Sequence, residues 1–297
     1  MTLRTRFAPS PTGPLHLGHA YSALLAFDLA QAEGGDFLVR VEDIDQSRCR
    51  PKWEALIFDD LAWLGLTWPN PVMRQSDRLP LYHSGLHHLW ARGLLYECSC
   101  NRRDIKDAIS APQEGVSPVA GPDGLIYPGT CRGKPRRSDQ PMPLNAALRL
   151  DMAQVVAEIS RTKRDLSFSE TGQGPDGQHG RIALDTKTLV QTVGDVVLCR
   201  RDMGTSYHLS VVLDDADQAI SHVTRGQDLF SATQIHVVLQ HLLDLPTPIY
   251  HHHPLVRDEH GKRLAKRDDA RAIQTYREAG ATAADIREMV GLSHGLT

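Results

Sequence analysis

Hydrophobic and polar positions follow a regular order near the start of the chain. Residues 3–7 and 36–42 alternate as short strands do, and between them apolar side chains recur at helical spacing from Leu17 to the stop signal Gly34–Gly35. A second helical pattern runs roughly from Lys52 to Leu64. This order of strand, helix, strand and helix predicts a parallel sheet with right-handed crossovers.

The pattern changes between Cys98 and about Gly194, where residues 111–143 and 172–180 are rich in glycine, proline and polar residues. Regular patterning returns at residues 206–215, 219–226 and 231–243. The predicted fold is therefore α/β, with a Rossmann-type parallel sheet split by an insertion. The units expected are residues 1–97 with 194–250, the insertion 98–193, and a loop with a small helical tail over 251–297.

Composition excludes some classes of protein. The hydrophobic content of 41% and charged content of 23% are ordinary for a globular chain. No apolar run approaches the roughly 18 residues of a membrane span, and the N-terminus lacks a secretory apolar stretch. The odd count of five cysteines favours a reducing compartment, so we expect a cytoplasmic protein. A net charge of −3 argues against a non-specific nucleic-acid coat.

Residues 8–21 read APSPTGPLHLGHAY, a stiff turn that leads from the first strand into the first helix. A helix N-terminus favours anions, and Gly13 and Gly18 allow a phosphate to approach the backbone. His16 and His19 lie three residues apart, so they can face one ligand on the first helical turn. A proline-rich turn with two surface histidines explains the segment equally well when it is taken alone.

A second segment, GKRLAKRDDA at residues 261–270, is a lysine-rich loop. A mobile ammonium group can follow the charge that develops on departing pyrophosphate. Taken alone, this segment is more typical of a basic surface loop. Its combination with the histidine segment is what makes the pair specific.

Together these segments resemble the catalytic half of the class I glutamyl-tRNA synthetases. RFAPSPTGPLHLGH resembles that family's glutamate-binding and HIGH segment, and RLAKR resembles its KMSKS loop, with Ala265 in place of the usual serine. GGDFLVRVEDIDQSR, QSDRLPLYHSGLHHL, YHLSVVLDD and HVTRGQDL match in the same order. The resemblance implies an ATP-dependent ligase that uses Mg²⁺ and forms no covalent enzyme intermediate. It assigns ATP binding to His16, Gly18, His19 and Lys266.

Glutamate needs cationic partners for two carboxylates and an acceptor for its ammonium group. Arg6 and Arg225 lie near the ends of predicted strands and Glu42 closes another, where ligands bind in such sheets. Without the resemblance, Arg6 and Glu42 read as a structural ion pair, and which arginine takes which carboxylate stays open. The glutamate site implied by the resemblance comprises Arg6, Phe7, Ala8, Pro9, Ser10, Glu42, Tyr207 and Arg225.

A Cys-x-Cys pair, Cys98 and Cys100, follows a helix-like stretch, and Tyr127 and Cys131 form Tyr-x-x-x-Cys. From spacing alone, free buried thiols are as good an explanation as a metal site. The resemblance favours one structural Zn²⁺ per chain on these four residues. Residues 251–253, three histidines, are a rival metal candidate for which a structural role is expected.

The chain ends at Thr297, soon after Lys266, and we expect no large helical region that reads an anticodon stem. In this respect it resembles the glutamyl-Q tRNA(Asp) synthetases. That family activates L-glutamate with ATP and transfers it to queuosine in the anticodon of tRNA(Asp). The alternatives are 3′-end charging of tRNA(Glu), a nucleotidyltransferase, or a non-catalytic binding module. We expect a monomer.

Overall fold

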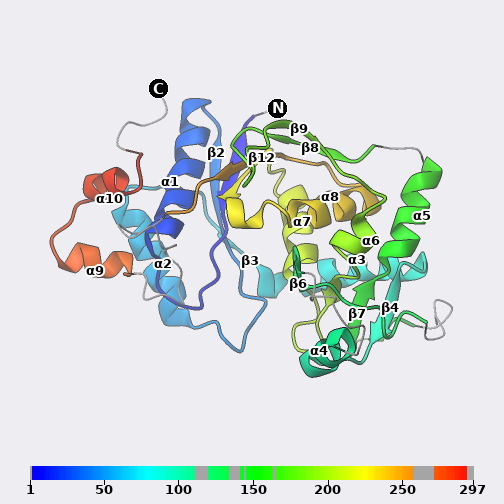
Figure 1. The fold of residues 1–297 in the computed structure, drawn as a ribbon. Helices are drawn as coiled ribbons and strands as arrows, with labels where there is room; N and C mark the ends of the chain where they lie inside the picture. Colours follow the sequence, from blue (N-terminus) through cyan, green and yellow to red (C-terminus); the bar gives the residue numbers. More distant parts are fainter. Residues whose placement is uncertain are drawn as a thin grey trace.

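The computed structural model places a parallel sheet at the centre of the molecule, with helices on both faces (Figure 1). Lys266 and the rest of GKRLAKRDDA lie outside the described residues. The structure describes residues 2–110, 120–133, 141–143, 145–162, 165–256 and 271–292.

The sheet has two parts that meet at its middle. Strands β1 (Arg4–Phe7), β2 (Asp36–Val41) and β3 (Met73–Arg74) are parallel. On the other side, β11 (His222–Gly226), β12 (Ile249–His253) and β8 (Ser167–Glu170) are parallel, and β9 (Gly180–Ala183) joins β8 antiparallel. The Ser221 N–H donates to the Arg4 carbonyl over 3.0 Å, which sets β11 beside β1. The carboxyl ends of β1, β2 and β11 therefore meet at one edge.

One face of the sheet carries α1 (Leu17–Ala32), α2 (Pro51–Trp63), α9 (Ile273–Glu278) and α10 (Ala283–Met289) (Figure 1). Buried side chains such as Leu24, Ile57 and Ile286 form its core. Arg287 on α10 donates two hydrogen bonds to Asp28 on α1, at 2.8 and 2.9 Å. The segment after residue 270 is thereby fixed against the first helix.

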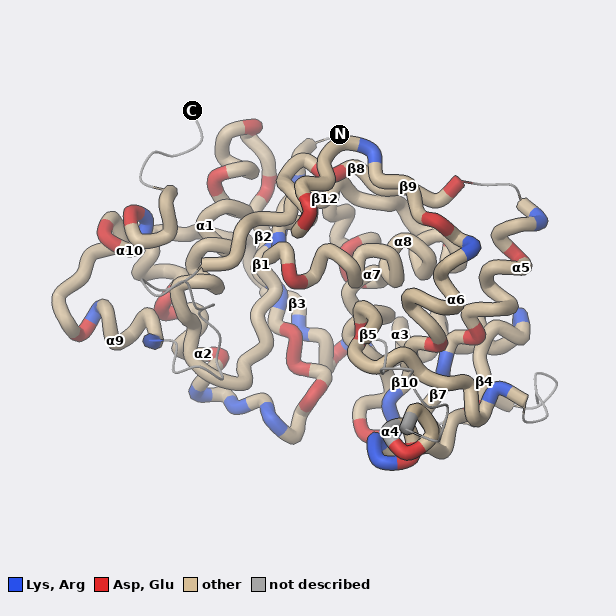
Figure 2. The backbone as a smooth tube through the Cα atoms, viewed as in Figure 1, with Lys and Arg blue, Asp and Glu red and all other residues tan. Residues whose placement is uncertain are grey.

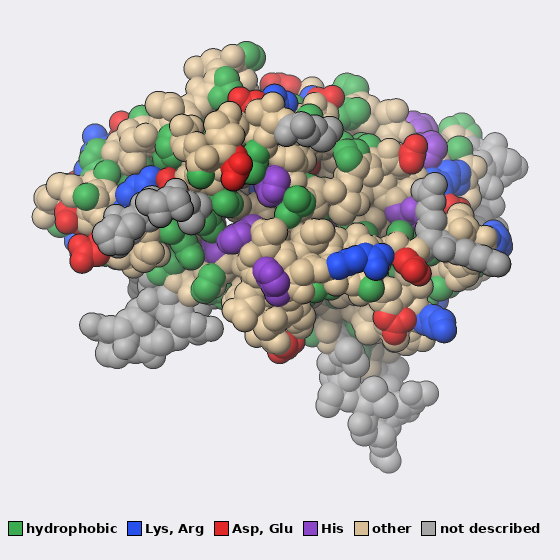
Figure 3. Space-filling model, turned by 90° about the horizontal axis from the view of Figure 1, so that it is seen from above, with side chains coloured by type: hydrophobic (Ala, Val, Ile, Leu, Met, Phe, Trp, Pro, Cys, Tyr) green, Lys and Arg blue, Asp and Glu red, His purple; other side chains and the backbone are tan. Residues whose placement is uncertain are grey.

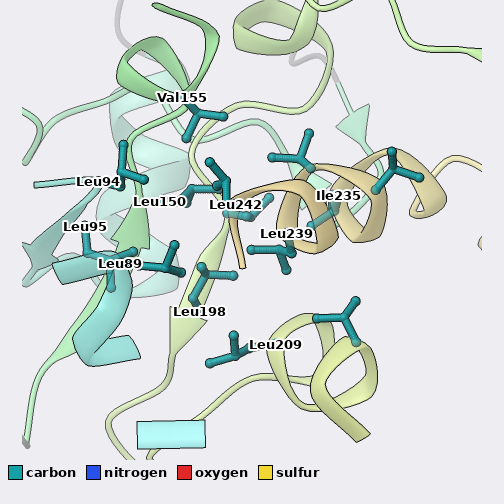
Figure 4. Close-up of a cluster of buried hydrophobic side chains, with 14 of the residues drawn as sticks. Leu89, Leu94, Leu95, Leu150, Val155, Leu198, Leu209, Ile235, Leu239 and Leu242 are labelled. Carbon is teal, nitrogen blue, oxygen red and sulfur yellow. The ribbon is translucent and has the colours of Figure 1, made fainter. Parts of the chain in front are cut away.

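The other face is larger and carries α3 (Leu79–Ala91), α7 (Tyr207–Asp217) and α8 (Thr233–Leu242). These helices pack against a second, antiparallel sheet of β4 (Leu95–Cys98), β7 (Ala147–Leu150) and β10 (Val197–Cys199). Leu89, Leu150, Leu198 and Leu239 come from four of these elements and meet in one hydrophobic core (Figure 4). The remaining elements are η1 (Gln75–Arg78), α4 (Arg102–Ser110), β5 (Ala120–Gly121), β6 (Gly124–Leu125), α5 (Met152–Thr162), α6 (Leu189–Thr192) and η2 (Gln227–Leu229).

The predicted α/β class and parallel sheet are confirmed, and the expected strands and helices around Leu17, Lys52 and residues 231–243 lie within two or three residues of their observed bounds. The helix-like stretch expected before the cysteine pair is α3, which is followed by β4, and Cys98 ends that strand. Strand pairing also crosses the predicted boundaries at residues 98 and 193. Strands β8 and β9 extend the central sheet. Strand β4 spans the boundary at residue 98, β10 begins after the boundary at residue 193, and both pair with β7 from the insertion.

Acidic and basic positions are interspersed over the chain (Figure 2). Among the described helices, none is both long and apolar enough to cross a membrane.

Asp60 on α2 generates a prediction about stability. Its carboxylate is fully buried, and neither oxygen has a hydrogen-bond partner within the described residues. Burial raises the pKa of Asp60 to about 6, with a smaller contribution from Asp59. The unfolded chain ionises Asp60 near its ordinary pKa. Ionisation of the buried Asp60 carboxyl therefore destabilises the folded protein. This effect is absent below about pH 4 and complete above about pH 6, where it lowers the free energy of unfolding by about 1–3 kcal/mol.

We expect Asp60→Asn to raise the melting temperature at pH 8 but not at pH 4, measured by calorimetry. Asp59→Asn is the matched control, because Asp59 is exposed and pairs with Arg277 at the surface. Parallel pH profiles for the wild type and Asp60→Asn would contradict the assignment.

Candidate active site

A cavity of about 380 Å³ opens where the central strands end. Residues from β1 and β11, the start of α1, and segments after β2 and β12 form its wall. Histidine side chains gather near the middle of the molecular face seen in Figure 3. Of the residues that the sequence singled out, the cavity wall includes Arg6, Phe7, Ala8, His16, Gly18, His19, Glu42, Tyr207 and Arg225.

The two remaining glutamate-site candidates, Pro9 and Ser10, lie close by. Ser10 lines a neighbouring cavity, and the Pro9 carbonyl accepts a hydrogen bond of 3.0 Å from the Glu42 N–H. The segment after β1 is thereby attached to the end of β2.

His16 and His19 organise the first turn of α1. The His16 ring accepts a hydrogen bond from the Gly18 N–H at Nδ1 (3.1 Å), and His19 Nδ1 accepts from the His16 N–H (3.2 Å). The rings stack with centroids 3.7 Å apart. Because both Nδ1 atoms accept hydrogen bonds from backbone N–H groups, the neutral rings carry their proton on Nε2. Ala272 pairs with His16 in a β-bridge, so the described residues on both sides of the Lys266 segment, Val256 and Ala272, lie at or beside the cavity.

Arg6 belongs to a buried charge network. It donates to both oxygens of Asp215 on α7, at 3.0 and 3.3 Å, and the fully buried Arg40 donates to the same carboxylate at 2.8 Å. Arg6 and Arg40 keep the pKa of the Asp215 carboxyl low against the opposing effect of burial. The positive charge of Arg6 is therefore already paired within the protein.

Arg225 has a different environment. It is 5% exposed, and it donates hydrogen bonds to neutral acceptors on His252, His236 and Thr233. Among the described residues, no carboxylate is in direct contact with its guanidinium group. A buried cation of this kind favours an incoming anion.

Glu42 lies across the cavity and supplies the negative charge. Burial raises the pKa of Glu42 to about 7, although Arg40 and Arg6 act in the opposite direction. Within the described residues, the Glu42 carboxylate accepts one side-chain hydrogen bond, a long one of 3.4 Å from Arg40. A ligand ammonium group placed here would favour the ionised carboxylate.

A second, larger cavity of about 900 Å³ adjoins the first. Glu42, Tyr207 and Leu229 line both cavities. Both acidic and basic side chains line the larger cavity, and its wall includes Cys98 and Cys100. The arginines that line it are Arg48, Arg102, Arg149, Arg200 and Arg201.

Cys98, Cys100 and Cys131 converge beside the β5–β6 hairpin, with sulfur atoms within 4.8 Å of one another. The Tyr127 hydroxyl lies 3.4 Å from the sulfur of Cys98 and 3.3 Å from that of Cys100. Tetrahedral zinc with bonds of about 2.3 Å has ligand atoms roughly 3.5–4 Å apart, so these four side chains fit a zinc site.

Ionisation at the cysteine cluster supports the same fit. Burial opposes ionisation of Cys131, but hydrogen bonds involving Tyr127, Ser99 and Cys100 lower the pKa of its thiol to about 6. Burial and neighbouring thiols raise the pKa of Tyr127, so a phenolate ligand there requires a cation. Within the part of the chain that is described, no metal-binding group forms at the three histidines of β12.

Sequence reasoning did not identify the partners of the two arginines. Asp215 lies inside the recognised segment YHLSVVLDD, so a signal existed, but nothing in the spacing connects it to Arg6 or Arg40. His236 carried no signal beyond helical patterning, and His252 was noted only within the histidine run 251–253, as a rival metal candidate with an expected structural role.

The carboxyl edge of the parallel sheet carries the HxGH sequence at the start of α1, beside a cavity large enough for an amino acid. This arrangement is typical of the catalytic domain of a class I tRNA synthetase. The family model for tRNA synthetases class I (E and Q), catalytic domain, matches residues 2–294, and the chain belongs to this family. It is 60% identical over 289 residues to the glutamyl-Q tRNA(Asp) synthetase of Rhodobacter capsulatus, covering 97% of this chain and 99% of that one. It is 40% identical over 296 residues to the enzyme of that name from Nocardia farcinica, covering 98% and 84%.

Solved structures support the fold. The glutamate tRNA ligase from Elizabethkingia meningosepticum, in complex with its amino acid, superposes with a TM-score of 0.72 at 24% identity. The match covers 98% of this chain, which spans 60% of that one. Methionyl-tRNA synthetase of Mycobacterium tuberculosis shares the fold at a TM-score of 0.53 and 10% identity.

We predict that Asp215→Asn lowers the free energy of unfolding by about 3 kcal/mol, because Arg6 and Arg40 lose the ionised partner that balances them. Denaturant unfolding measures the change. Asp217→Asn on the same helix is the control, since Asp217 is exposed and pairs only at the surface with Arg78. Equal effects for the two variants would contradict the role given to Asp215.

Proposed function

We propose that this protein activates L-glutamate with ATP to glutamyl-adenylate and transfers glutamate to queuosine in the anticodon of tRNA(Asp). One observation carries the proposal: Arg225 and Glu42 face a single cavity at the strand ends, beside the start of α1. Membership of the class I family and the 60% identical relative support the same reaction and acceptor.

In this proposal the first cavity binds glutamate. Arg6 and Arg225 donate to its carboxylates, and ionised Glu42 accepts from its ammonium group. Ser10 and Tyr207 supply hydroxyl groups, and the backbone of Phe7, Ala8 and Pro9 forms the rim. Which arginine takes which carboxylate stays open.

ATP binds across the start of α1. His16, Gly18 and His19 hold the triphosphate at the helix N-terminus, and Lys266, which lies outside the described residues, also binds the phosphates. The α-carboxylate of glutamate attacks the α-phosphorus in line, and pyrophosphate leaves. Mg²⁺ bound with ATP supplies charge neutralisation on the phosphates. No covalent enzyme intermediate is needed, because positioning and electrostatics carry the step.

The second cavity receives the acceptor nucleoside. It adjoins the glutamate site through Glu42 and Tyr207, and its arginines suit a phosphate backbone. Residues 1–97 and 194–250, together with the central-sheet strands β8 and β9, then form the catalytic unit, the rest of 98–193 the acceptor-binding unit, and 251–297 the signature loop and tail. The proposal takes the protein to act as a monomer, which is supported by the formation of both cavities within a single chain.

One structural Zn²⁺ is bound by Cys98, Cys100, Tyr127 and Cys131. Its role is to hold together the insertion around the β5–β6 hairpin, whose small apolar cluster contains Tyr96 and little else besides these ligands.

Labelled glutamate supplied with ATP and, in separate reactions, tRNA(Asp) with queuosine, tRNA(Asp) without it, and tRNA(Glu) tests the function. We expect label only on the queuosine-bearing tRNA, in its anticodon fragment after nuclease digestion. Label at the 3′ end of tRNA(Glu) would assign the alternative charging reaction. Absence of glutamate-dependent ATP–pyrophosphate exchange would reject both.

The pKa of Glu42 predicts a pH dependence. Glu42 must be ionised to accept the ammonium group, and its pKa is about 7 in the free protein. We expect kcat/KM for glutamate to rise about tenfold from pH 6 to pH 8. Glu42→Gln should lower kcat/KM at least about 100-fold and remove the dependence. An equally steep profile in the variant would assign the titration to another group.

Metal analysis tests the zinc site. We expect about one equivalent of zinc in the purified protein, and a large loss in Cys100→Ser. Cys49→Ser is the matched control, since Cys49 lies outside the cluster. Less than about half an equivalent in the wild type, purified without chelator, would contradict the assignment.

A further inference from the structure

The guanidinium group of Arg225 is held by three buried, uncharged acceptors. Its Nε–H donates to Nε2 of His252 over 3.0 Å, Nη1 donates to Nδ1 of His236 over 3.0 Å, and Nη2 donates to Oγ1 of Thr233 over 2.6 Å. An imidazole nitrogen accepts only when it carries no proton. Both histidines are therefore neutral, with their proton on the opposite nitrogen of the ring.

Behind His252 lies a buried carboxylate that fixes this tautomer. His252 Nδ1–H donates to Oε2 of Glu170, which is 1% exposed. The other oxygen of Glu170 accepts from the backbone N–H groups of His252 and Gly172, each at 2.8 Å. These hydrogen bonds fix the orientation of the His252 imidazole, so that the lone pair on its Nε2 faces the Nε–H of Arg225.

A second arm runs behind His236. His236 Nε2–H donates to Nδ1 of His208 over 3.1 Å, and Nε2 of His208 lies 3.3 Å from Oδ1 of Asp123. Asp123 lies in the turn between β5 and β6, at the wall of the second cavity. Each ring accepts on one side and donates on the other, so the chain of hydrogen bonds has a single direction, from Arg225 to Asp123.

We propose that His236 and His252 are positioning residues for amino-acid binding, oriented from behind by His208 with Asp123 and by Glu170. They fix the plane of the Arg225 guanidinium without placing a carboxylate against it. Among the described residues, no acceptor takes the second N–H of Nη1 or of Nη2, so this pair is available to a ligand carboxylate. The inference rests on the proposed function, because it takes glutamate as the ligand.

The contrast with Arg6 supports this reading. Asp215 holds Arg6 in place by pairing with its charge, whereas neutral rings hold Arg225 and leave its charge for the ligand. A preorganised arginine binds a carboxylate more tightly, because less side-chain freedom is lost on binding.

Substitutions that keep or remove the acceptor test the proposal. His236→Asn and His252→Gln each retain an oxygen where the ring nitrogen accepts from Arg225, and His236→Leu and His252→Leu do not. In glutamate-dependent ATP–pyrophosphate exchange, we expect the leucine variants to raise the KM for glutamate about tenfold or more. The KM for ATP should change less than about twofold, and the amide variants should recover most of the glutamate affinity.

His251→Asn is the matched control, because His251 adjoins His252 on β12 but bonds to Thr171 instead of Arg225. If a leucine variant does not fold, Glu170→Gln is used, which keeps the shape of the side chain and should raise the KM for glutamate about threefold to tenfold. An unchanged KM for glutamate, or equal changes for glutamate and ATP, would overturn the proposal.

Failure of the proposed function gives a different result. The wild type would then show no glutamate-dependent exchange. Calorimetric titration of the wild type and variants with L-glutamate makes the same comparison without turnover. Weaker binding in the leucine variants supports the positioning role, and binding that is unchanged, or absent in the wild type, rejects it.

Discussion

The carboxylate of Asp215 is the interaction on which the site depends. It comes from α7, on the larger face of the sheet, and it accepts from Arg6 on β1 and Arg40 on β2 in a buried position. Two buried arginines side by side would repel each other without it. Because these strands carry the rim of the cavity, the ion network fixes the positions of the HxGH turn and of Glu42 relative to α7.

The charged groups of the first cavity differ in how their charge is paired within the protein. The charge of Arg6 is paired with Asp215, whereas the charge of Arg225 is not paired with a carboxylate among the described residues, because its hydrogen-bond partners there are neutral. Glu42 is poised between its two protonation states near neutral pH. This combination suits a zwitterionic ligand. A ligand carboxylate would pair with the Arg225 charge, and a ligand ammonium group would favour the ionised form of Glu42.

Much of the fold was predictable from the sequence, because periodicity and stop signals act locally. The strands at residues 3–7 and 36–42 and the helix from Leu17 are examples. The convergence of the cysteines with Tyr127 was expected only from the family resemblance, because spacing alone left free buried thiols as an equal alternative. The pairing of β8 with β12 and the histidine arms behind Arg225 were not predictable. They join residues from distant segments, such as Glu170 with His252 and Asp123 with His208, and no local pattern encodes such contacts.

Only a few side chains separate the two cavities, since Glu42, Tyr207 and Leu229 belong to both walls. Under the proposed function, the mixed anhydride formed in one chamber lies within a side chain's width of the hydroxyl that attacks it. A labile acyl group would then pass directly to its acceptor, and hydrolysis in bulk solvent would have little time to compete.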